Sequence, residues 1–366
     1  MSSFTSNSNG PANLNYSEQL QLKIEKFRAL ISPYYDGNID CFESPESEYR
    51  MRTEFRIWHD GDRIDYAMFK PGTKELCTLS EFPIASAPIQ RMMPMLLESI
   101  HSSETLKNRL FSTEFLSTQF GELLVTLIYH RALDDTWEKA AIALQEKLDI
   151  QIIGRSRKQK IVLSQDFVTE SFSVANLTYQ YRQYENSFTQ PNASINQQML
   201  NWVCSQALGL GEDLLELYCG NGNFTLPLSK LFRKVLTTEI SKSSIAALQW
   251  NIENNAIDNI DHARLSAEEI TQALDGVRPF RRLAHLDLME YNFSTVFVDP
   301  PRAGVDDKSL KFLSRFKNII YVSCNPETLR NNLDFLNETH SVVSAAAFDQ
   351  FPFTPHLESA VRLKAR

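Results

Sequence analysis

The sequence lacks the segments that mark a membrane or a secreted protein. No stretch approaches the roughly 18–20 consecutive apolar residues that a membrane-spanning helix needs. Residues 1–13 are rich in Ser and Asn but contain neither the basic nor the apolar part of a signal peptide. We therefore expect a soluble, cytoplasmic protein without a membrane partner, and nothing in the sequence demands an obligate protein partner.

Cysteines are few and are not spaced for metal binding. The chain has five, an odd number, and no two of them show the Cys-x-x-Cys spacing of zinc and iron–sulfur sites. Scattered cysteines are typical of a reduced compartment rather than of a disulfide framework. We therefore expect neither a metal nor an iron–sulfur cluster.

Basic residues are outnumbered by acidic ones. The chain has 37 Lys and Arg against 45 Asp and Glu, a formal net charge of −8 at pH 7. This excess argues mildly against nucleic-acid binding, which needs clustered Lys and Arg, but net charge does not fix local charge. Any binding to RNA should rest on few phosphate contacts and be only moderately sensitive to salt.

The length indicates two domains. With 366 residues, of which 43% are hydrophobic, the chain is long enough to bury two cores. Residues 1–178 interleave hairpin and helix patterns, which predicts an α+β domain. Residues 179–366 alternate strand and helix patterns, which predicts a doubly wound, mostly parallel sheet. A helix is expected near residues 17–31, and it could equally pack on the second domain.

Two groups of basic residues in the first domain could face RNA. Residues 50–58 alternate, so that apolar side chains face a core and three arginines share the other face of a sheet. Residues 155–160 form a predicted hairpin tip with four basic residues and no acid. A solvated surface is the alternative in both places, although guanidinium groups also match phosphate geometry. The predicted RNA-binding residues are Arg50, Arg52, Arg56, Arg155, Arg157, Lys158 and Lys160.

The second domain contains a candidate cofactor loop. Its predicted strands cover residues 214–218, 234–239, 262–265, 295–299, 318–323 and 341–348. The first strand runs into a turn with Gly220 and Gly222, and the second ends at Glu239, as in sites that bind an adenosine ribose. Because Thr225 replaces the third glycine of the dinucleotide fingerprint, the pattern favours S-adenosylmethionine, with NAD as the alternative.

A lone cysteine stands where another strand opens into a loop. Cys324 follows an apolar strand and precedes Asn-Pro, which cannot continue a β-ladder. Ligands bind at this rim of open α/β sheets. A thiolate there could add to carbon 6 of a uracil and make carbon 5 reactive toward a methyl donor, and its surroundings should then lower its pKa. A small, packed cysteine is the alternative.

Two further features fit this chemistry. Asp299 begins an Asp-Pro-Pro corner that is followed by Arg302, where methyltransferases of exocyclic amines have an aromatic residue; amine methylation is therefore disfavoured. Methylation of carbon 5 also needs a base that removes the carbon 5 proton. Glu358, in a proline-rich loop near the C-terminus, is the first candidate and His356 the second, while an ordinary surface acid is the alternative for Glu358.

Taken together, several motifs resemble the RNA 5-methyluridine methyltransferases. They are Phe-Thr-Gln-Pro-Asn (188–192), Leu-Tyr-Cys-Gly-Asn-Gly-Asn-Phe (217–224), Asp-Pro-Pro-Arg (299–302), Ser-Cys-Asn-Pro (323–326) and residues 349–358. Residues 49–52 and the chain length extend the resemblance to the tRNA (uracil-54-C5)-methyltransferases. The resemblance implies Cys324 as the nucleophile and Glu358 as the proton acceptor. It also implies an S-adenosylmethionine site made by Gln190, Tyr218, Asn223, Glu239 and Asp299.

The resemblance implies methylation of the T-loop uridine of tRNA, with the first domain holding the T-arm. Members that act on ribosomal RNA carry an additional β-barrel and a four-cysteine iron–sulfur cluster, which this chain lacks the cysteine spacing to bind. Three rival functions stay open. They are methylation of another RNA (rRNA or a tRNA-like RNA), a non-catalytic tRNA-binding or folding factor, and methylation of a small molecule.

Overall fold

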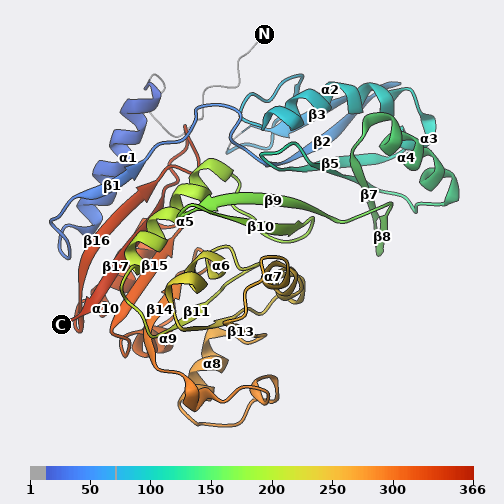
Figure 1. The fold of residues 1–366 in the computed structure, drawn as a ribbon. Helices are drawn as coiled ribbons and strands as arrows, with labels where there is room; N and C mark the ends of the chain where they lie inside the picture. The colour runs from blue at the N-terminus through green and yellow to red at the C-terminus, as the bar shows by residue number, and fades with distance from the viewer. Residues whose placement is uncertain (1–13, 71) are drawn as a thin grey trace. The chain divides into compact units, whose positions relative to one another are not determined.

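The computed structural model describes residues 14–70 and 72–366, which divide into two units. The first unit contains the described part of residues 45–171 together with residues 182–193, and the second contains residues 14–44, 172–181 and 194–366. The N-terminal helix α1 (Tyr16–Ile31) therefore groups with the C-terminal half of the chain (Figure 1). The assignment of RNA binding to one unit and catalysis to the other stays a prediction.

The first unit is built on a seven-stranded sheet with the order β4-β3-β2-β5-β6-β7-β8. Its strands are β2 (Arg52–Asp60), β3 (Arg63–Phe69), β4 (Leu76–Leu79), β5 (Leu110–Ser117), β6 (Leu123–Tyr129), β7 (Gln151–Ser156) and β8 (Gln159–Val162). Neighbouring strands are antiparallel, except that β6 and β7 are parallel and joined through α4 (Asp135–Leu148). The predicted hairpins and the α+β class are thus found. The remaining helices of this unit are α2 (Ala87–His101) and α3 (Glu104–Lys107).

The alternation in β2 sorts its side chains between the two faces of this sheet. Phe55 and Ile57 are buried in the core that the helices cover. Arg52, Glu54 and Arg56 alternate with them and so lie on the opposite face, as the sequence predicts. We call this second face, which carries Arg52, Glu54 and Arg56, the charged face of the first unit.

The second unit contains an eight-stranded sheet with the order β1-β16-β17-β15-β14-β11-β12-β13. Its strands are β1 (Ile39–Phe42), β11 (Asp213–Leu217), β12 (Lys234–Thr238), β13 (Ile260–Ala263), β14 (Phe293–Val298), β15 (Asn318–Ser323), β16 (His340–Phe348) and β17 (Glu358–Ala365). Strands β11 to β15 are parallel to their neighbours among themselves, and β17 is antiparallel to both β15 and β16. The predicted doubly wound sheet is therefore confirmed. The sequence did not indicate β1, a four-residue strand that pairs with β16 at the sheet edge.

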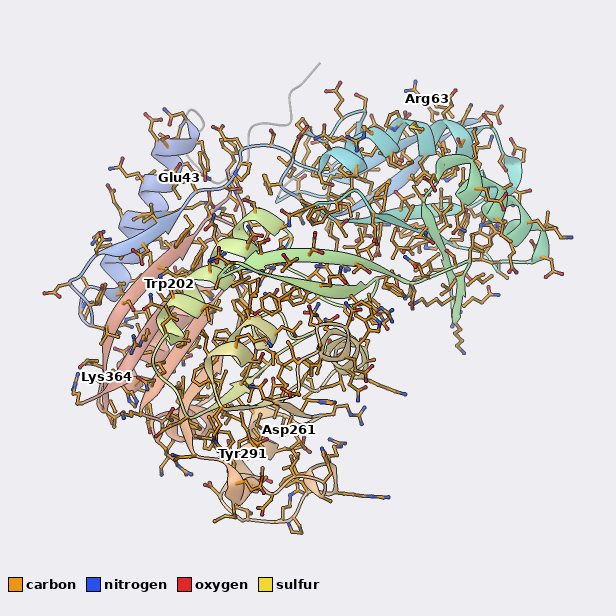
Figure 2. The ribbon with its side chains drawn as sticks, viewed as in Figure 1. Glu43, Arg63, Trp202, Asp261, Tyr291 and Lys364 are labelled. Carbon is orange, nitrogen blue, oxygen red and sulfur yellow. The ribbon has the colours of Figure 1, made fainter. Side chains whose placement is uncertain are left out.

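Helices cover both faces of this sheet. One face carries α1, α8 (Ala267–Leu274), α9 (Asp307–Leu313) and α10 (Pro326–Leu336) over a continuous apolar core. The other carries α5 (Ala193–Ala207), α6 (Thr225–Leu228) and α7 (Lys242–Asn254) (Figure 1). Trp202 of α5 packs against Phe348, and its indole N–H donates a hydrogen bond to Asp40 of β1 at 2.9 Å (Figure 2). Short 3-10 turns are η1 (Ser229–Leu231), η2 (Arg281–Leu283) and η3 (Leu288–Glu290).

A two-stranded hairpin links the two units along the chain. It consists of β9 (Phe167–Val174) and β10 (Leu177–Tyr184). Ala175 and Asn176 both have positive φ angles, 48° and 67°, as a two-residue type I′ turn requires. The division between the units passes through both strands.

Candidate active site

The carboxyl ends of four parallel strands meet at one edge of the sheet in the second unit. The residues that directly follow β11, β12, β14 and β15 are Tyr218, Glu239, Asp299 and Cys324. Strand β11 lies between β12 and β14, so the strand order reverses there, and open α/β sheets bind their ligands at such a point. Four of the residues predicted to bind the cofactor or substrate thus lie along one edge.

Glu358 reaches the same edge from an antiparallel strand. It is the first residue of β17, and the next residue, Ser359, is paired with Ser323 of β15. Because Cys324 follows Ser323, this register brings the carboxyl group of Glu358 close to the thiol of Cys324. Two groups that are 34 residues apart in the sequence (358 − 324) are therefore neighbours.

Burial, with some contribution from neighbouring negative charges, raises the pKa values of the acidic groups at this edge. Burial raises the pKa of the Cys324 thiol to about 11, with further contributions from the nearby charges of Glu358 and Asp299. Burial, followed by the charge of Asp299, raises the pKa of Glu358 to about 8, and burial raises the pKa of Asp299 to about 7. The expectation of a lowered thiol pKa is therefore wrong for the free protein. The positive charge of Arg302 acts in the expected direction but is outweighed.

His356 has a different environment from Glu358. Its side chain is exposed, and its ring makes an edge-to-face contact with Phe351, with 6.0 Å between ring centroids. Partial burial and the nearby positive charges of Arg302 and Lys23 lower its pKa. His356 is thus neutral at physiological pH, whereas Glu358 is the acid that adjoins Cys324.

The glycine-rich loop after β11 depends on unusual backbone angles. Gly222 has a φ of 86°, and a Cβ atom there would lie 2.5 Å from a methyl carbon of Leu248, so only glycine fits. Tyr218 has a φ of 62°, which residues with a side chain rarely adopt. Strain of this kind is common at ligand-binding sites, where the surrounding structure holds it in place.

Backbone N–H groups orient the carboxylate of Glu239. One oxygen accepts a hydrogen bond from the N–H of Gly220 at 3.1 Å, and the other accepts from Ile240 at 2.8 Å and Ser241 at 2.7 Å. The carboxylate is thereby fixed against the glycine-rich loop while remaining partly exposed. A ribose hydroxyl could therefore donate to it without a rearrangement.

Asn196 and Asn251 support the loop, and sequence reasoning missed both. The side-chain amides of Asn196 and Asn223 hydrogen-bond reciprocally, at 2.9 and 2.8 Å. The amide of Asn251 donates to the carbonyl of Asn221 at 2.8 Å. Both supporting asparagines are buried on helices, and their only signal in the sequence is an amide at a position where the helix pattern calls for an apolar residue.

Glu216 lies buried beneath this loop. It belongs to β11, its side chain is 1% exposed, and burial raises its pKa to about 8. In the unfolded chain a glutamate has a pKa of about 4.3. Because the folded pKa is the higher one, the folded state is favoured below the unfolded value, and this contribution is lost as the pH rises toward 8.

We expect Glu216→Gln to remove part of the pH dependence of stability. Glutamine is uncharged, so the wild-type protein should lose roughly 2–3 kcal/mol more of its unfolding free energy than the variant between pH 6 and pH 9. Urea unfolding at several pH values measures this difference. Glu253→Gln, at an exposed position on α7, serves as the control and should follow the wild type. Parallel pH curves for Glu216→Gln and wild type would contradict the expectation.

The remaining predicted residues lie in the first unit. Gln190 follows β10 in residues 182–193 of that unit. Arg155 and Lys160 are opposite each other in the β7–β8 hairpin, and both form ion pairs with Glu185, at 2.6 Å and 3.4 Å. Only Arg157 and Lys158 form its two-residue tip, and both are exposed.

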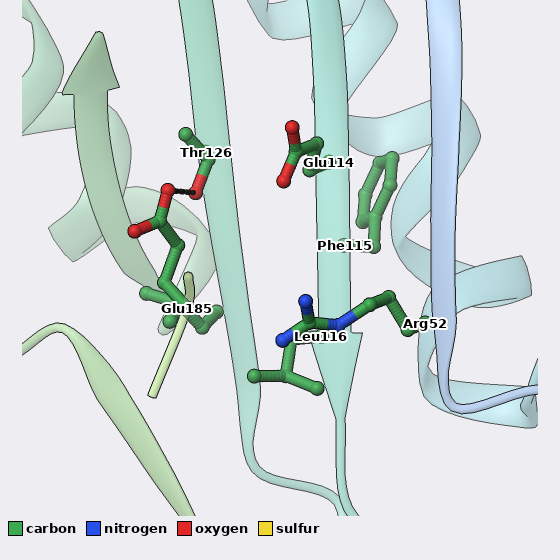
Figure 3. A pocket seen from close by; sticks show the side chains of 7 residues that line it. Arg52, Glu114, Phe115, Leu116, Thr126 and Glu185 are labelled. Carbon is green, nitrogen blue, oxygen red and sulfur yellow. Dashed lines mark hydrogen bonds between the residues drawn. The ribbon is translucent and has the colours of Figure 1, made fainter. Parts of the chain in front are cut away.

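The charged face of the first unit is also rich in carboxylates. Glu54 and Glu114 are directly opposite each other on β2 and β5. Burial, followed by the negative charges of Glu54 and Glu185, raises the pKa of Glu114. A small pocket beside them is shown in Figure 3. It is lined by Arg52, Glu114, Phe115, Leu116, Leu124, Thr126 and Glu185. Arg52 spans this pocket and donates to the carbonyl of Tyr184 at 3.2 Å. Phosphates would therefore meet both signs of charge on this face.

An arginine, a phenylalanine and a histidine form a stack on the first unit. The guanidinium carbon of Arg56 lies 4.1 Å from the ring centroid of Phe111. The rings of Phe111 and His130 are nearly parallel, with their centroids 3.9 Å apart. We call these three residues the Arg56 stack. The sequence pattern indicated Arg56 but neither of the two rings. Phe111 lies near the start of β5 and His130 directly follows β6, so both are at the open end of the β5–β6 hairpin.

Comparison with known proteins identifies the family. A family model described as tRNA (uracil-5-)-methyltransferase matches residues 15–366. The chain belongs to this family. The tRNA/tmRNA (uracil-C(5))-methyltransferase of Neisseria meningitidis serogroup B is 56% identical over 358 residues, which cover 96% of this chain and 99% of that protein. The protein of the same name from Acinetobacter baylyi is 55% identical over 355 residues, or 95% of this chain and 98% of that protein.

A solved structure shares the fold. The crystal structure of Pyrococcus abyssi tRNA (uracil-54, C5)-methyltransferase in complex with S-adenosyl-L-homocysteine has a TM-score of 0.73 at 23% identity, and the match covers 96% of this chain and 84% of that chain. The predicted fold, an α+β domain preceding an S-adenosylmethionine-dependent methyltransferase domain, is thereby confirmed. As a family member the chain is a tRNA (uracil-C5)-methyltransferase, and S-adenosylmethionine is its methyl donor. Within residues 14–70 and 72–366, no helix has the length and apolar character to cross a membrane.

Proposed function

We propose that this protein methylates carbon 5 of the uridine at position 54, in the T-loop of tRNA, through a covalent intermediate. The observation that carries the proposal is the register of β15 and β17, which brings Cys324 and Glu358 together at the edge that holds the glycine-rich loop. A thiol beside a carboxyl group is the pair that activation of a uracil and removal of its proton require. The names of the relatives support tRNA as the substrate, with the tRNA-like tmRNA as a second one.

The residues at the sheet edge fit an adenosyl cofactor. Tyr218, Asn223, Glu239 and Asp299 would hold it, with the fixed carboxylate of Glu239 accepting hydrogen bonds from the ribose hydroxyls. The reciprocal pair of Asn196 and Asn223 keeps the end of the loop in place. When bound, S-adenosylmethionine supplies the methyl group.

The protein side chains perform the remaining steps. The thiolate of Cys324 forms a bond to carbon 6 of the uracil, and the electron pair of the carbon 5–carbon 6 double bond shifts toward carbon 5 and oxygen 4. Carbon 5 then forms its bond to the methyl group, whose bond to the donor sulfur breaks with the electron pair staying on that sulfur. The ionised carboxylate of Glu358 removes the proton from carbon 5, the double bond re-forms, and the thiolate leaves.

The target uridine has to leave its stacked position to reach this edge, because its reacting carbon is otherwise inaccessible. RNA loops are bound largely through shape and through bases stacked on aromatic rings or guanidinium planes. The Arg56 stack offers such a surface, and the exposed tip residues Arg157 and Lys158 offer contacts to phosphate. The carboxylates on the same face would limit the number of phosphate contacts, so we expect binding to be only moderately sensitive to salt.

We expect Phe111→Ala to weaken tRNA binding. Phe111 lies between Arg56 and His130 and holds both in place, so its loss should remove the plane on which a base can stack. Loss of such a stacking plane costs about 1–3 kcal/mol, or roughly a 5- to 150-fold rise in Kd. Fluorescence titration with a labelled T-arm measures this change, and the rate at saturating RNA should stay near the wild-type value. Phe120→Ala, at a 75% exposed ring in the turn between β5 and β6, is the matched control and should bind normally. Equal Kd values for Phe111→Ala and wild type would remove the stack from RNA binding.

Transfer of a labelled methyl group to tRNA tests the proposed function as a whole. A T-arm stem-loop should accept one methyl group, and the nucleoside released from it should be 5-methyluridine. Replacing the target uridine by cytidine should abolish the transfer. Binding of tRNA without methyl transfer would favour a folding factor, and transfer to ribosomal RNA alone would contradict the proposed substrate.

A further inference from the structure

The loop that joins β16 to β17 leads directly into Glu358. It comprises residues 349–357, and its two ends adjoin Phe348 and Glu358, which form the last pair of the β16–β17 ladder. Within the loop, Phe353 has a φ of 59°, a left-handed conformation that is unfavourable for a residue with a side chain. Such a conformation persists only where neighbouring groups hold it, and the end of a ladder frays unless its loop is fixed.

Helix α1 supplies the groups that hold this loop. The side-chain oxygen of Gln19 accepts a hydrogen bond from the N–H of Phe353 at 2.8 Å, and its amide nitrogen donates to the carbonyl of Thr354 at 3.1 Å. One side chain thus binds two consecutive residues at the strained position. The ring of Tyr16, one turn earlier on α1, lies 5.8 Å from the ring of Phe353.

A buried ion pair makes a second connection between α1 and the loop. The ammonium group of Lys23 lies 2.7 Å from Asp349 and donates to the carbonyl of Phe351 at 2.9 Å. The side chains of Lys23 and Asp349 are 6% and 0% exposed. Lys23 lies on the apolar stripe of α1 between Leu20 and Phe27, where the helix pattern alone would place a hydrophobic residue. A charge is costly at such a position unless a specific partner compensates for it.

Hydrogen bonds within the loop connect the residues that α1 contacts to the residues that precede Glu358. The hydroxyl of Thr354 donates to the carbonyl of Phe351 at 2.8 Å and accepts from the N–H of His356 at 3.3 Å. The contacts of α1 therefore reach along the loop to within two residues of Glu358. None of these residues is part of the thiol, carboxyl and cofactor groups described above.

We propose that Gln19 and Lys23 are positioning residues for the methyl-transfer reaction, which fix the 349–357 loop and with it the carboxyl group of Glu358 next to Cys324. The inference rests on the proposed role of Glu358 as the base that removes the carbon 5 proton. Formation of the bond to Cys324 and methyl transfer do not need that base. Loosening the loop therefore slows the last step of the reaction and leaves the earlier steps intact.

The test uses Gln19→Ala and Lys23→Met in the full-length protein. With ordinary tRNA and S-adenosylmethionine, both variants should accumulate a covalent protein–RNA complex, visible on a denaturing gel. The value of kcat should fall roughly 10- to 100-fold and KM for tRNA should fall with it, because the slowed step follows methyl transfer. Lys26→Met is the matched control. Lys26 lies on the same helix but pairs with Glu327 at the surface, with side chains 69% and 63% exposed, so this variant should behave as wild type.

The covalent complex separates a positioning role from a structural one. A variant that is merely less stable loses activity in proportion to its unfolded fraction and accumulates no complex. Gln19→Ala removes two hydrogen bonds without burying a lone charge, so it tests the inference even where Lys23→Met is poorly folded. Hydrogen exchange gives a readout independent of catalysis, because amides in residues 350–357 should exchange faster in Gln19→Ala and not in Lys26→Met.

Glu358→Gln in the same experiment distinguishes the two proposals. If Glu358→Gln traps the complex but Gln19→Ala and Lys23→Met turn over at the wild-type rate, the positioning role is wrong and the proposed base stands. If Glu358→Gln traps no complex and turns over normally, both the proposed base and the positioning role fail. Trapping by all three variants supports both.

Discussion

Cys324→Ala should abolish methyl transfer to tRNA and should also abolish every covalent complex with RNA. The reaction as proposed has no route to a reactive carbon 5 without the bond between the sulfur and carbon 6, so the loss should be at least about 10⁴-fold, as for other removed nucleophiles. Methyl transfer from labelled S-adenosylmethionine measures the loss. The fold should be unaffected, because the residue stands in a loop directly after β15.

A tRNA with 5-fluorouridine at the target position tests directly whether Cys324 forms the covalent bond to RNA. Fluorine at carbon 5 cannot be removed by a base, so the wild-type protein should stop at a stable covalent complex. Cys324→Ala should form none, whereas Cys41→Ala, which removes an exposed thiol on β1, should form it normally. Methylation of ordinary tRNA by Cys324→Ala at the wild-type rate would rule out the covalent route.

Glu358→Gln should have the opposite effect on the covalent complex. Glutamine has nearly the same size as glutamate but cannot accept the proton from carbon 5, so turnover should fall roughly 10²- to 10⁴-fold. Attack by Cys324 and methylation precede this step, and a methylated covalent complex should therefore accumulate with ordinary tRNA. Glu327→Gln, at an exposed position on α10, should turn over normally.

The pH dependence gives an independent measure of the same residue. A base with a pKa of about 8 is mostly protonated at lower pH, and its ionised fraction falls about tenfold for each pH unit below that value. The rate at which the methylated covalent complex of the wild-type protein breaks down to free RNA should therefore rise from pH 6 toward pH 8 and level off above it. Glu358→Gln should lose this rise. A flat wild-type profile between pH 6 and 8 would mean that another group removes the proton.

Much of the candidate active site could be predicted, because its position depends on the local sequence pattern of apolar strands. Each of Tyr218, Glu239, Asp299 and Cys324 directly follows an apolar strand, and strand ends are visible in the sequence. Parallel strands have their carboxyl ends at the same edge of the sheet. Residues that are predicted to follow these strands are therefore also predicted to lie near one another. The position of Glu358 is a different case, because it depends on β17 running antiparallel beside β15.

The features that the sequence did not reveal depend on contacts between distant segments. Lys23 and Asp349 are 326 residues apart, and no local pattern indicates that either has a partner. The same holds for Arg155 and Glu185, which turns a predicted RNA-binding arginine into one side of an ion pair. The pKa of Cys324 was expected to fall and instead rises, since burial and nearby carboxylates depend on the complete packing around the thiol.

The sequence by itself determined the pattern of strands and helices, the glycine-rich loop and the strand end at which Cys324 stands, because hydrophobic periodicity, glycine turns and strand ends are properties of short segments. Only the tertiary structure decided which charges meet, which acids are kept from water, and which helix holds the loop before Glu358. These properties follow from desolvation and from the pairing of segments hundreds of residues apart, and both exist only once the chain has folded.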